Sequence, residues 1–348
     1  MYRVYLYRRF GIRCVFKSLD FVLDLLPRRA RVIPKDIRNI LLIKPDHLGD
    51  VVLFTSVLKP IKEKYPNSNI DVVVGPWSNQ ILNHNPHIRK VYNVNHYKHN
   101  RCSENVLIKL WVFFVTYLRV LSAIRKEQYG AILNFRSYGA NLVTLQYFSC
   151  SKCNIGFASS GLSPLLDIEV ELKKGQHEVE YFLDILKELG VYKKLSNLTF
   201  QMFPQDGDRI FVDRVIDENK LQKFIILHPG SGDKNRMKDD GFWRDLLAKE
   251  SRKIVLCGTA DERDLVKNIP FSNAVDLMGV FSLLQLFEFY KRAELIYTVE
   301  SLAGHIASMT NTKTVSFYSD FTDTVRWRPV GSNVEVIRDH KKYLDELV

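Results

Sequence analysis

The sequence predicts an α/β fold with two Rossmann-like domains that face a central cleft. At 348 residues the chain is too long for one typical domain and suggests two, at about 150 residues each. Short apolar runs alternate with stretches of helical spacing, which is the pattern of a parallel sheet wrapped by helices. The pattern breaks near residues 195–217 and then restarts. We therefore expect an N-terminal segment at 1–38, one domain at 39–205 and a second at 206–348 that ends in a helix.

The first predicted domain alternates strands with helices. Its strands are short apolar runs at 40–43, 69–74, 90–94, 131–134 and 154–157. Its helices are expected directly after the first strand and at 77–83, 104–127, 139–147 and 178–189. The last helix is expected to stop at Gly190, because glycine commonly ends a helix.

The second predicted domain repeats this alternation. Its strands are expected at 224–227, 253–257, 274–277, 295–299 and 314–317. Its helices are expected at 241–249, 262–267, 283–292 and 302–309. The residues between the two domains include Pro204 and Gly207, which favour turns, so we expect irregular structure there.

Residues 1–38 differ in composition from the rest of the chain. They contain ten Lys or Arg residues and three acidic residues, interleaved with aromatic and aliphatic side chains. This mixture is typical of a helix that lies in a membrane interface, where anionic lipid attracts each basic side chain by about 1 kcal/mol. It also fits a basic helix packed on the protein's own surface, and both interpretations stay open. We expect no nucleic-acid binding, because no recognised motif accompanies the charge.

The composition of the whole chain narrows the class of partner. Lys and Arg exceed Asp and Glu by 50 to 39, which gives a net charge of +11 and favours phosphorylated small molecules or an acidic membrane surface. The five cysteines are irregularly spaced and indicate a reducing compartment. The most apolar stretch, 106–124, is interrupted by Lys109 and Arg119. Its uncharged middle is shorter than the roughly 20 residues that span a bilayer, so we expect a buried or half-buried helix.

The first candidate site is the loop Lys44-Pro-Asp-His-Leu-Gly-Asp50. It follows a strand and precedes a helix, which is where open α/β sheets bind ligands. Gly49 allows a close approach of the backbone to a ligand, and Asp50 supplies an ionisable group. A helix cap is an equally good explanation of the aspartate, and the two roles are compatible.

The second candidate site is the loop from His228 to Lys238. Its glycines expose backbone N–H groups, Ser231 adds a hydroxyl, and basic residues follow, a combination that cradles phosphate oxygens. The glycine spacing is not that of a P-loop. A plain turn with surface lysines is the alternative.

Two further strand ends carry polar side chains. After the strand at 295–299, Glu300 and Ser301 precede a helix that contains His305, and backbone amides at a helix start point toward a ligand. After the strand at 253–257, Glu262 offers a carboxylate for ribose hydroxyls. Helix capping by Glu262 and a structural role for His305 are the competing interpretations.

These four motifs, in the chain order Lys44–Asp50, His228–Lys238, Glu262 and Glu300–His305, resemble glycosyltransferase family 9, the bacterial heptosyltransferases of lipopolysaccharide assembly. The resemblance covers about residues 39–330 and leaves the basic N-terminal segment as an addition. It implies a GT-B fold, with an acceptor-binding N-terminal domain and a nucleotide-sugar-binding C-terminal domain.

The resemblance also implies a role for each motif. Asp50 is implied as the catalytic base of an inverting sugar transfer, and Lys44 and Gly49 are expected near the acceptor or a phosphate. The donor-binding residues are implied to be Gly230, Ser231, Gly232, Arg236, Lys238, Glu262, Glu300, Ser301 and His305.

The implied substrates are both anionic. The donor is expected to be a nucleotide-diphosphate sugar, with ADP-heptose as a candidate, and the acceptor a lipid-linked saccharide such as lipopolysaccharide core. We expect no further cofactor and no metal ion, because backbone amides and basic side chains can stabilise the leaving diphosphate. Such an enzyme is expected in the cytoplasm, peripheral on the inner face of the cytoplasmic membrane and in contact with it through residues 1–38.

The motifs depart from the family pattern in three places. Glu300 replaces an aspartate, Leu302 stands where a glycine is usual, and Arg236-Met-Lys238 replaces a basic residue followed by tryptophan. The alternative function is therefore a catalytically impaired glycan- or nucleotide-binding relative of the same fold, which Leu302 favours. A nucleotide-dependent oxidoreductase is less well supported, because no Gly-x-Gly-x-x-Gly follows the first strand.

Overall fold

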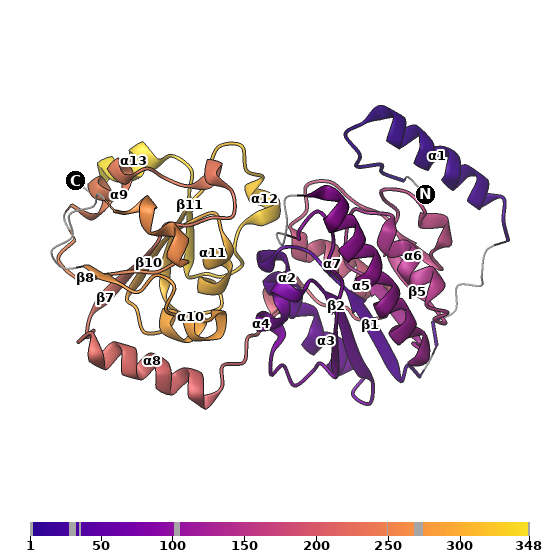
Figure 1. The fold of residues 1–348 in the computed structure, drawn as a ribbon, viewed down its shortest axis with the longest axis horizontal. Coiled ribbons are helices and arrows are strands. Elements are labelled where there is room, and N and C mark those ends of the chain that lie inside the picture. The colour runs from indigo at the N-terminus through magenta and orange to yellow at the C-terminus, as the bar shows by residue number, and fades with distance from the viewer. Residues whose placement is uncertain are drawn as a thin grey trace. The chain divides into compact units, whose positions relative to one another are not determined.

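Two six-stranded parallel sheets, one in each half of the chain, form the framework of the protein (Figure 1). The computed structural model describes residues 3–27, 33–34, 36–100, 105–248, 250–267 and 274–346. The chain divides into two compact units, Met1–Phe200 and Gln201–Val348, which we call the N-terminal and C-terminal units. The two sheets confirm the predicted α/β class. The predicted domain division after residue 205 falls just beyond the unit boundary.

The sheet of the N-terminal unit has the strand order β3-β2-β1-β4-β5-β6. The strands are β1 (Asn39–Ile43), β2 (Asn69–Val74), β3 (Lys90–Asn93), β4 (Ala131–Asn134), β5 (Asn154–Phe157) and β6 (Ile168–Val170). This is the Rossmann order, with β1 paired to β2 on one side and to β4 on the other. The direction of winding changes at β1, so its carboxyl end is the switch point where such sheets bind ligands.

Helices cover both faces of this sheet and complete its core. They are α2 (Leu48–Phe54), η1 (Thr55–Val57), α3 (Leu58–Lys64), η2 (Pro76–Ser78), α4 (Asn79–Leu82), α5 (Val106–Lys126), α6 (Asn141–Phe148), η3 (Ser163–Leu165), α7 (Glu178–Glu188) and η4 (Leu195–Asn197). One buried cluster joins Leu41 and Ile43 of β1 to Val120 and Ile124 of α5. Four of the five residues of β1 are buried, as expected for a central parallel strand.

The C-terminal unit repeats the same topology. Its strands are β7 (Phe224–His228), β8 (Lys253–Leu256), β9 (Ala274–Asp276), β10 (Leu295–Val299), β11 (Lys313–Phe317) and β12 (Val334–Ile337), in the order β12-β11-β10-β7-β8-β9. Its helices are α8 (Asp206–Glu218), η5 (Lys234–Arg236), α9 (Asp240–Leu247), η6 (Ala260–Leu265), α10 (Leu283–Tyr290), α11 (Leu302–Ala307), α12 (Thr324–Trp327) and α13 (His340–Glu346). The switch point here is the carboxyl end of β7, between β8 and β10.

The irregular structure predicted for 195–217 is wrong for most of that range. Helix α8 begins at Asp206, where the backbone N–H of Gln205 donates to the Asp208 carboxylate at 2.9 Å. The helix buries Val212 and Val215 and packs on α10. Pro204 lies just before the start of this helix, and Gly207 lies in its first turn. Residues that favour turns therefore stand here at the start of a helix and not in a long irregular segment. The strands β6 and β12 were not predicted either; each lies at the edge of its sheet.

Helix α1 (Phe10–Asp24) is held on the N-terminal unit by polar contacts. Arg3, which precedes the helix, joins its last residue to the unit, with Nη1 2.5 Å from Asp24 Oδ2 and Nε 2.7 Å from Glu169 Oε2. The backbone N–H of Leu162 donates to Asp20 Oδ1 at 2.6 Å. The interpretation of a helix packed on the protein's own surface is therefore confirmed for this part of 1–38. Several apolar side chains of α1 remain exposed, Phe10 at 72% and Phe21 at 67% among them. Residues 1–2, 28–32 and Lys35 of the predicted basic segment lie outside the described residues.

Helix α5 is half-buried. It runs along the outside of the N-terminal unit, in contact with β3 and α6 (Figure 1). Of its 21 residues only Val120 and Ile124 are buried. The helix is therefore half-buried, which is one of the two predicted outcomes, because only one stripe of side chains reaches the core.

Candidate active site

An ion-pair cluster around Lys44 occupies the carboxyl end of β1. Lys44 Nζ lies 2.8 Å from Glu178 Oε1 and 3.0 Å from Asp46 Oδ2. It also donates to the carbonyl oxygen of Phe135 at 3.3 Å and lies 4.8 Å from the ring centre of Phe182. All three charged side chains are 2% exposed. Burial alone would lower the pKa of Lys44, but the two carboxylates outweigh it and raise that pKa above its usual range.

Arg136 binds the same aspartate from the opposite side. Its Nε lies 2.8 Å from Asp46 Oδ1, and its guanidinium carbon lies 4.7 Å from the ring centre of Tyr138. His99 Nε2 lies 3.5 Å from the same carboxylate. Burial opposes ionisation of Asp46, but Arg136 and Lys44 outweigh it and hold its pKa well below the usual range. Asp46 is therefore a carboxylate at neutral pH, held between two cations.

Asp50 is the third carboxylate of this cluster. It is half-buried in the first turn of α2, and its Oδ2 accepts a hydrogen bond from the backbone N–H of His47 at 3.2 Å. Loss of solvent, together with the neighbouring Asp46 and Glu178, raises the pKa of Asp50 to about 7 against the opposing charge of Lys44. The two cations of the cluster, Lys44 and Arg136, are already paired with the other two carboxylates, Asp46 and Glu178. Asp50 is thus both a helix cap and a carboxylate poised to exchange a proton near neutral pH.

The sequence reasoning missed four residues of this cluster: Asp46, His99, Arg136 and Glu178. A partial signal existed for three of them. Asp46 lies inside the first candidate loop itself. Arg136 follows β4, which pairs with β1, and residues that follow neighbouring parallel strands lie at the same sheet edge. Glu178 is the first residue of α7, a helix whose start was predicted. His99 carries no such signal, because it lies in a loop far from any predicted motif.

The ligand contacts predicted for Lys44 and Gly49 stay predictions. Lys44 is buried and its ammonium group is bound to protein carboxylates, so in this structure it organises the cluster. Gly49 is the second residue of α2, between His47 and Asp50. Gly49 lies in the first turn of α2 with Asp50, whereas Lys44 directly follows β1.

The glycine-rich loop after β7 occupies the switch point of the C-terminal sheet. Ser231 Oγ donates to the carbonyl oxygen of Glu300 at 2.9 Å, so the loop is tied to the end of β10. Arg236 Nη1 lies 3.1 Å from Glu300 Oε1, and the hydroxyl of Thr322 donates to the other carboxylate oxygen. Burial raises the pKa of Glu300, and the hydrogen bond from Thr322 and the charge of Arg236 oppose that rise. Glu300 therefore orients Arg236, whose side chain stays 37% exposed and able to meet an anion.

Glu262 lies against the same loop. A Cβ at Gly230 would be 2.0 Å from the Glu262 carboxylate, and a Cβ at Gly258 would be 2.6 Å from it, so glycine is required at both positions for this approach. The backbone N–H of Thr259 donates to Glu262 Oε2 at 2.8 Å. The capping interpretation is confirmed, while the ribose contact predicted for Glu262 stays a prediction.

Lys238 is turned to a different partner. Its Nζ lies 2.6 Å from Nε2 of His340, at the start of α13, and burial lowers the pKa of Lys238. The two predicted basic residues thus differ, because Arg236 pairs with the motif carboxylate at Glu300 and Lys238 does not. Gly232 is exposed, and its predicted contact with a phosphate stays a prediction.

Ser301 and His305 lie in the last motif. Ser301 is the N-cap of α11, and its Oγ accepts from the backbone N–H of Ala303 at 3.3 Å. His305 is buried in the same helix. Leu302 begins α11 and is not among the residues with positive φ. The backbone at this position therefore makes no conformational demand for glycine.

Asp206 and Asp208 have an Asp-x-Asp spacing that can hold a metal ion, and the expectation of metal-free transfer did not weigh them. Both carboxylates have protein partners in the first turn of α8. Asp206 Oδ1 lies 2.6 Å from Arg209 Nη1, and Asp208 accepts from the backbone of Gln205. Among the described residues, no group of three or more His, Cys, Asp or Glu side chains is arranged to hold a metal ion.

Three known proteins resemble the chain over most of its length. "Lipopolysaccharide heptosyltransferase 3" of Escherichia coli is 23% identical over 305 residues, which covers 82% of this chain and 84% of the relative. The crystal structure of a family 9 glycosyltransferase from Veillonella parvula has a TM-score of 0.74 at 18% identity, covering 90% of this chain and 89% of that one. The structure of E. coli ADP-heptose lps heptosyltransferase II has a TM-score of 0.71 at 18% identity, covering 89% and 97%. These structures show the GT-B fold.

The family assignment rests on the sequence match. The model of glycosyltransferase family 9 (heptosyltransferase) matches residues 117–347, which is more than half of the chain. The matched residues include Arg136 and Glu178 of the cluster around Lys44. They also include the whole of the glycine-rich loop after β7 with its partners Glu262 and Glu300. The chain therefore belongs to glycosyltransferase family 9, the heptosyltransferase family.

Proposed function

We propose that this protein is an inverting heptosyltransferase that moves a heptose from ADP-heptose to a lipid-linked saccharide of the lipopolysaccharide core. Family membership supports glycosyl transfer. The names of the relatives, "Lipopolysaccharide heptosyltransferase 3" and "ADP-heptose lps heptosyltransferase II", supply the substrate classes. The observation that carries the mechanism is Asp50, a half-buried carboxylate whose pKa lies near neutrality.

In the proposed reaction Asp50 takes the proton of an acceptor hydroxyl. The acceptor oxygen then attacks the anomeric carbon of the donor, on the face opposite the diphosphate. The bond between that carbon and the diphosphate oxygen breaks, and the leaving group keeps the electron pair. Inversion follows from a single displacement, for which one base suffices. Asp46 and Glu178 are engaged by cations, which leaves the proton-accepting role to Asp50.

The proposed donor site is the loop after β7. Backbone N–H groups from Gly230 to Gly232 and the guanidinium of Arg236 would stabilise the negative charge of the leaving ADP. Arg236 is held in place by Glu300, so little reorganisation is required when charge develops. We propose that the reaction needs no metal ion, because these groups can supply the positive potential.

We propose that the enzyme works in the cytoplasm, against the inner face of the cytoplasmic membrane where its acceptor is anchored. The basic segment at residues 1–38 would contact anionic lipid. The exposed Phe10 and Phe21 of α1 support this contact. A binding protein without activity is less well supported, because the backbone at Leu302 is compatible with the same helix start.

Arg236→Ala is expected to lower affinity for ADP by about 10- to 100-fold, because a charge-assisted hydrogen bond is worth roughly 1.5–3 kcal/mol. A thermal-shift titration with ADP measures this, since a ligand that binds only the folded state raises Tm. Arg209→Ala is the matched control, because Arg209 lies in the same unit and pairs with Asp206 on the surface. An unchanged ADP titration in Arg236→Ala would contradict the donor site. If the wild type binds ADP-heptose but transfers no sugar, the alternative function, a catalytically impaired binding protein of the same fold, would be favoured.

The pH profile is expected to show the titration of Asp50. A base must be ionised to accept a proton, so kcat/KM should fall about tenfold per pH unit below the pKa of about 7 and level off above it. Burial lowers the pKa of His99 to about 3, so that histidine does not titrate in this window. The measurement is kcat/KM for transfer from ADP-heptose between pH 5 and 9. If Asp50→Asn keeps some activity and its kcat/KM falls over the same acidic pH range as that of the wild type, the titrating group is a residue other than Asp50.

A further inference from the structure

Helix α5 leaves an apolar stripe uncovered along its outer face. The stripe consists of Leu107, Trp111, Phe114 and Leu118, which are 75%, 66%, 51% and 46% exposed. These residues recur at i, i+4, i+7 and i+11, so they lie on one side of the helix over about 16 Å. Exposed apolar side chains that form a continuous patch mark an interaction surface, whereas isolated ones do not.

A different face of α5 is fixed to the body of the N-terminal unit. Val120 and Ile124 are buried in the core cluster, and Phe113 and Tyr117 pack against it. The hydroxyl of Tyr117 lies 2.8 Å from that of Thr144 in α6. The helix has 21 residues, and its most apolar 18-residue window has a mean hydropathy of 1.8, enough to cross a membrane by length and composition. Its packing against the sheet instead favours a position parallel to a membrane surface.

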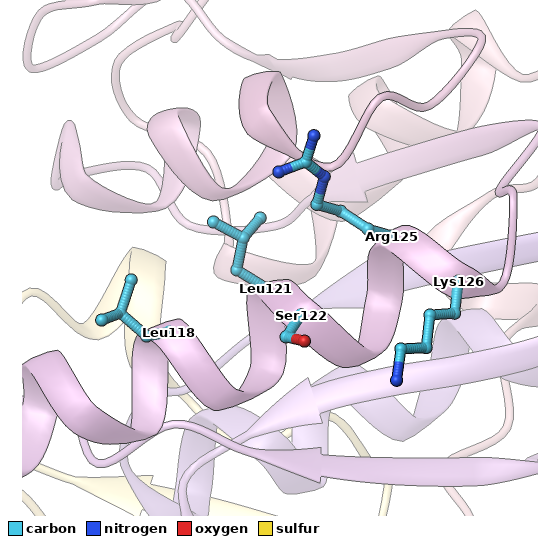
Figure 2. A pocket seen from close by; sticks show the side chains of 5 residues that line it. All are labelled: Leu118, Leu121, Ser122, Arg125 and Lys126. Atoms are coloured by element: carbon cyan, nitrogen blue, oxygen red, sulfur yellow. The ribbon is translucent and has the colours of Figure 1, made fainter.

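The C-terminal end of α5 combines apolar and cationic side chains around a surface depression of about 400 Å³. Figure 2 shows its lining residues along successive turns of the helix, with the guanidinium of Arg125 on the same side as Leu118 and Leu121. Lys126 extends to the other side of the helix (Figure 2). Across its whole length α5 carries four cations, Lys109, Arg119, Arg125 and Lys126, and no acidic residue.

We propose that α5 docks the N-terminal unit on an anionic lipid surface. The helix lies in the plane of the interface, with the stripe in the boundary between headgroups and acyl chains. Trp111 occupies the depth at which tryptophan is favoured in membranes. Arg125 and Lys126 bind lipid phosphate beside the depression. The charge of the helix selects this partner, because a bare apolar stripe would fit a protein equally well, whereas four cations without an acid fit anionic headgroups.

This surface is separate from the predicted contact through residues 1–38, and it does not depend on the transfer reaction. Helix α1 contacts η3, whereas α5 packs on β3 and α6. The membrane binding of variants on α1 and on α5 can therefore be compared directly. A loss of activity toward soluble substrates would report on catalysis and not on membrane binding.

The test is flotation of the full chain with vesicles of phosphatidylcholine and phosphatidylglycerol in a 7:3 ratio. Trp111→Glu/Phe114→Glu is expected to lower the partition onto these vesicles by at least about tenfold, because binding scales with buried apolar area. Tyr192→Glu/Ile210→Glu is the matched control, since both side chains are exposed apolar residues outside α5 at 75% and 68%. Arg125→Gln/Lys126→Gln is expected to lower binding to the 7:3 vesicles and to leave the weaker binding to pure phosphatidylcholine unchanged.

A Phe10→Glu/Phe21→Glu variant measures the contribution of α1 in the same assay. Loss of binding in the α1 variant alone, with the α5 variant floating like the wild type, would overturn the proposal. So would a wild type that fails to float and forms a dimer that Trp111→Glu/Phe114→Glu dissociates in sedimentation equilibrium, because the stripe would then be an interface between copies. Circular dichroism melting of each variant shows whether the fold is retained, as expected for substitutions on an outer face.

Discussion

Asp50→Asn is expected to keep the fold and to lower kcat for sugar transfer by a factor of about 10²–10⁴, the usual contribution of a general base. The amide has nearly the shape of the carboxylate and its oxygen can still accept the backbone N–H of His47, so α2 keeps its cap. It has no basic oxygen with which to take the acceptor proton. The loss should fall on kcat rather than on ADP affinity, because the proposed donor loop lies in the other unit.

The control for this prediction is Glu180→Gln. Glu180 has the same structural role in α7 that Asp50 has in α2, since it accepts the backbone N–H of His177 at 2.8 Å from the third position of the helix. If the effect of Asp50→Asn came only from a weakened helix cap, Glu180→Gln would show a comparable loss. Full transfer activity of Asp50→Asn with an accepted donor would remove Asp50 from the mechanism.

The sequence predicted the framework well because the framework is locally encoded. Buried parallel strands such as β2, β4 and β5 are short apolar runs between polar turns, and their predicted bounds agree with the structure. Two edge strands, β6 and β12, were missed, whereas the other two edge strands, β3 and β9, were predicted. Helix α8 was missed because its first turn contains Gly207 and three polar residues, although its later turns place Val212 and Val215 on one face.

The prediction of the site was partial for a different reason. Asp50, Ser231 and Glu300 lie at strand ends, and the strand-end rule requires only local sequence. The partners of these residues are set by tertiary contacts. Lys44 meets Glu178 across 134 positions of sequence, and no pattern around either residue specifies that pair. Sequence reasoning therefore finds a reacting group more readily than the neighbours that set its pKa.

The outer face of α5 shows a third limit. Periodicity identified the helix, and the buried positions Val120 and Ile124 follow the expected spacing. The sequence left open whether its remaining apolar residues are buried or exposed, because the expectation was a buried or half-buried helix. Only the structure shows that a second apolar stripe, at Leu107, Trp111, Phe114 and Leu118, stays between 46% and 75% exposed.

Lys44→Met is expected to cost about 3–5 kcal/mol of folding free energy, which is the range for breaking a buried ion pair by removing one partner. Methionine matches the length of the lysine stem, so the packing against Phe182 is largely kept. The carboxylates of Asp46 and Glu178 would lose a cation 3.0 and 2.8 Å away while both stay buried. Urea unfolding followed by circular dichroism measures the change. Lys90→Met is the matched control, because Lys90 pairs with Glu127 on the surface and should change stability far less.

The double variant Lys44→Met/Glu178→Gln shows how much of the lost folding free energy comes from the missing ion pair and how much from the buried carboxylate that is left without a cation. If the cost of Lys44→Met comes mainly from the carboxylate left behind, the double variant should be more stable than Lys44→Met alone. A double variant less stable than either single one would show instead that packing by Lys44 dominates. The same cation lowers the pKa of Asp50. Lys44→Met should therefore move the acid limb of kcat/KM to higher pH wherever the protein is folded, which links the stability of the cluster to the strength of the proposed base.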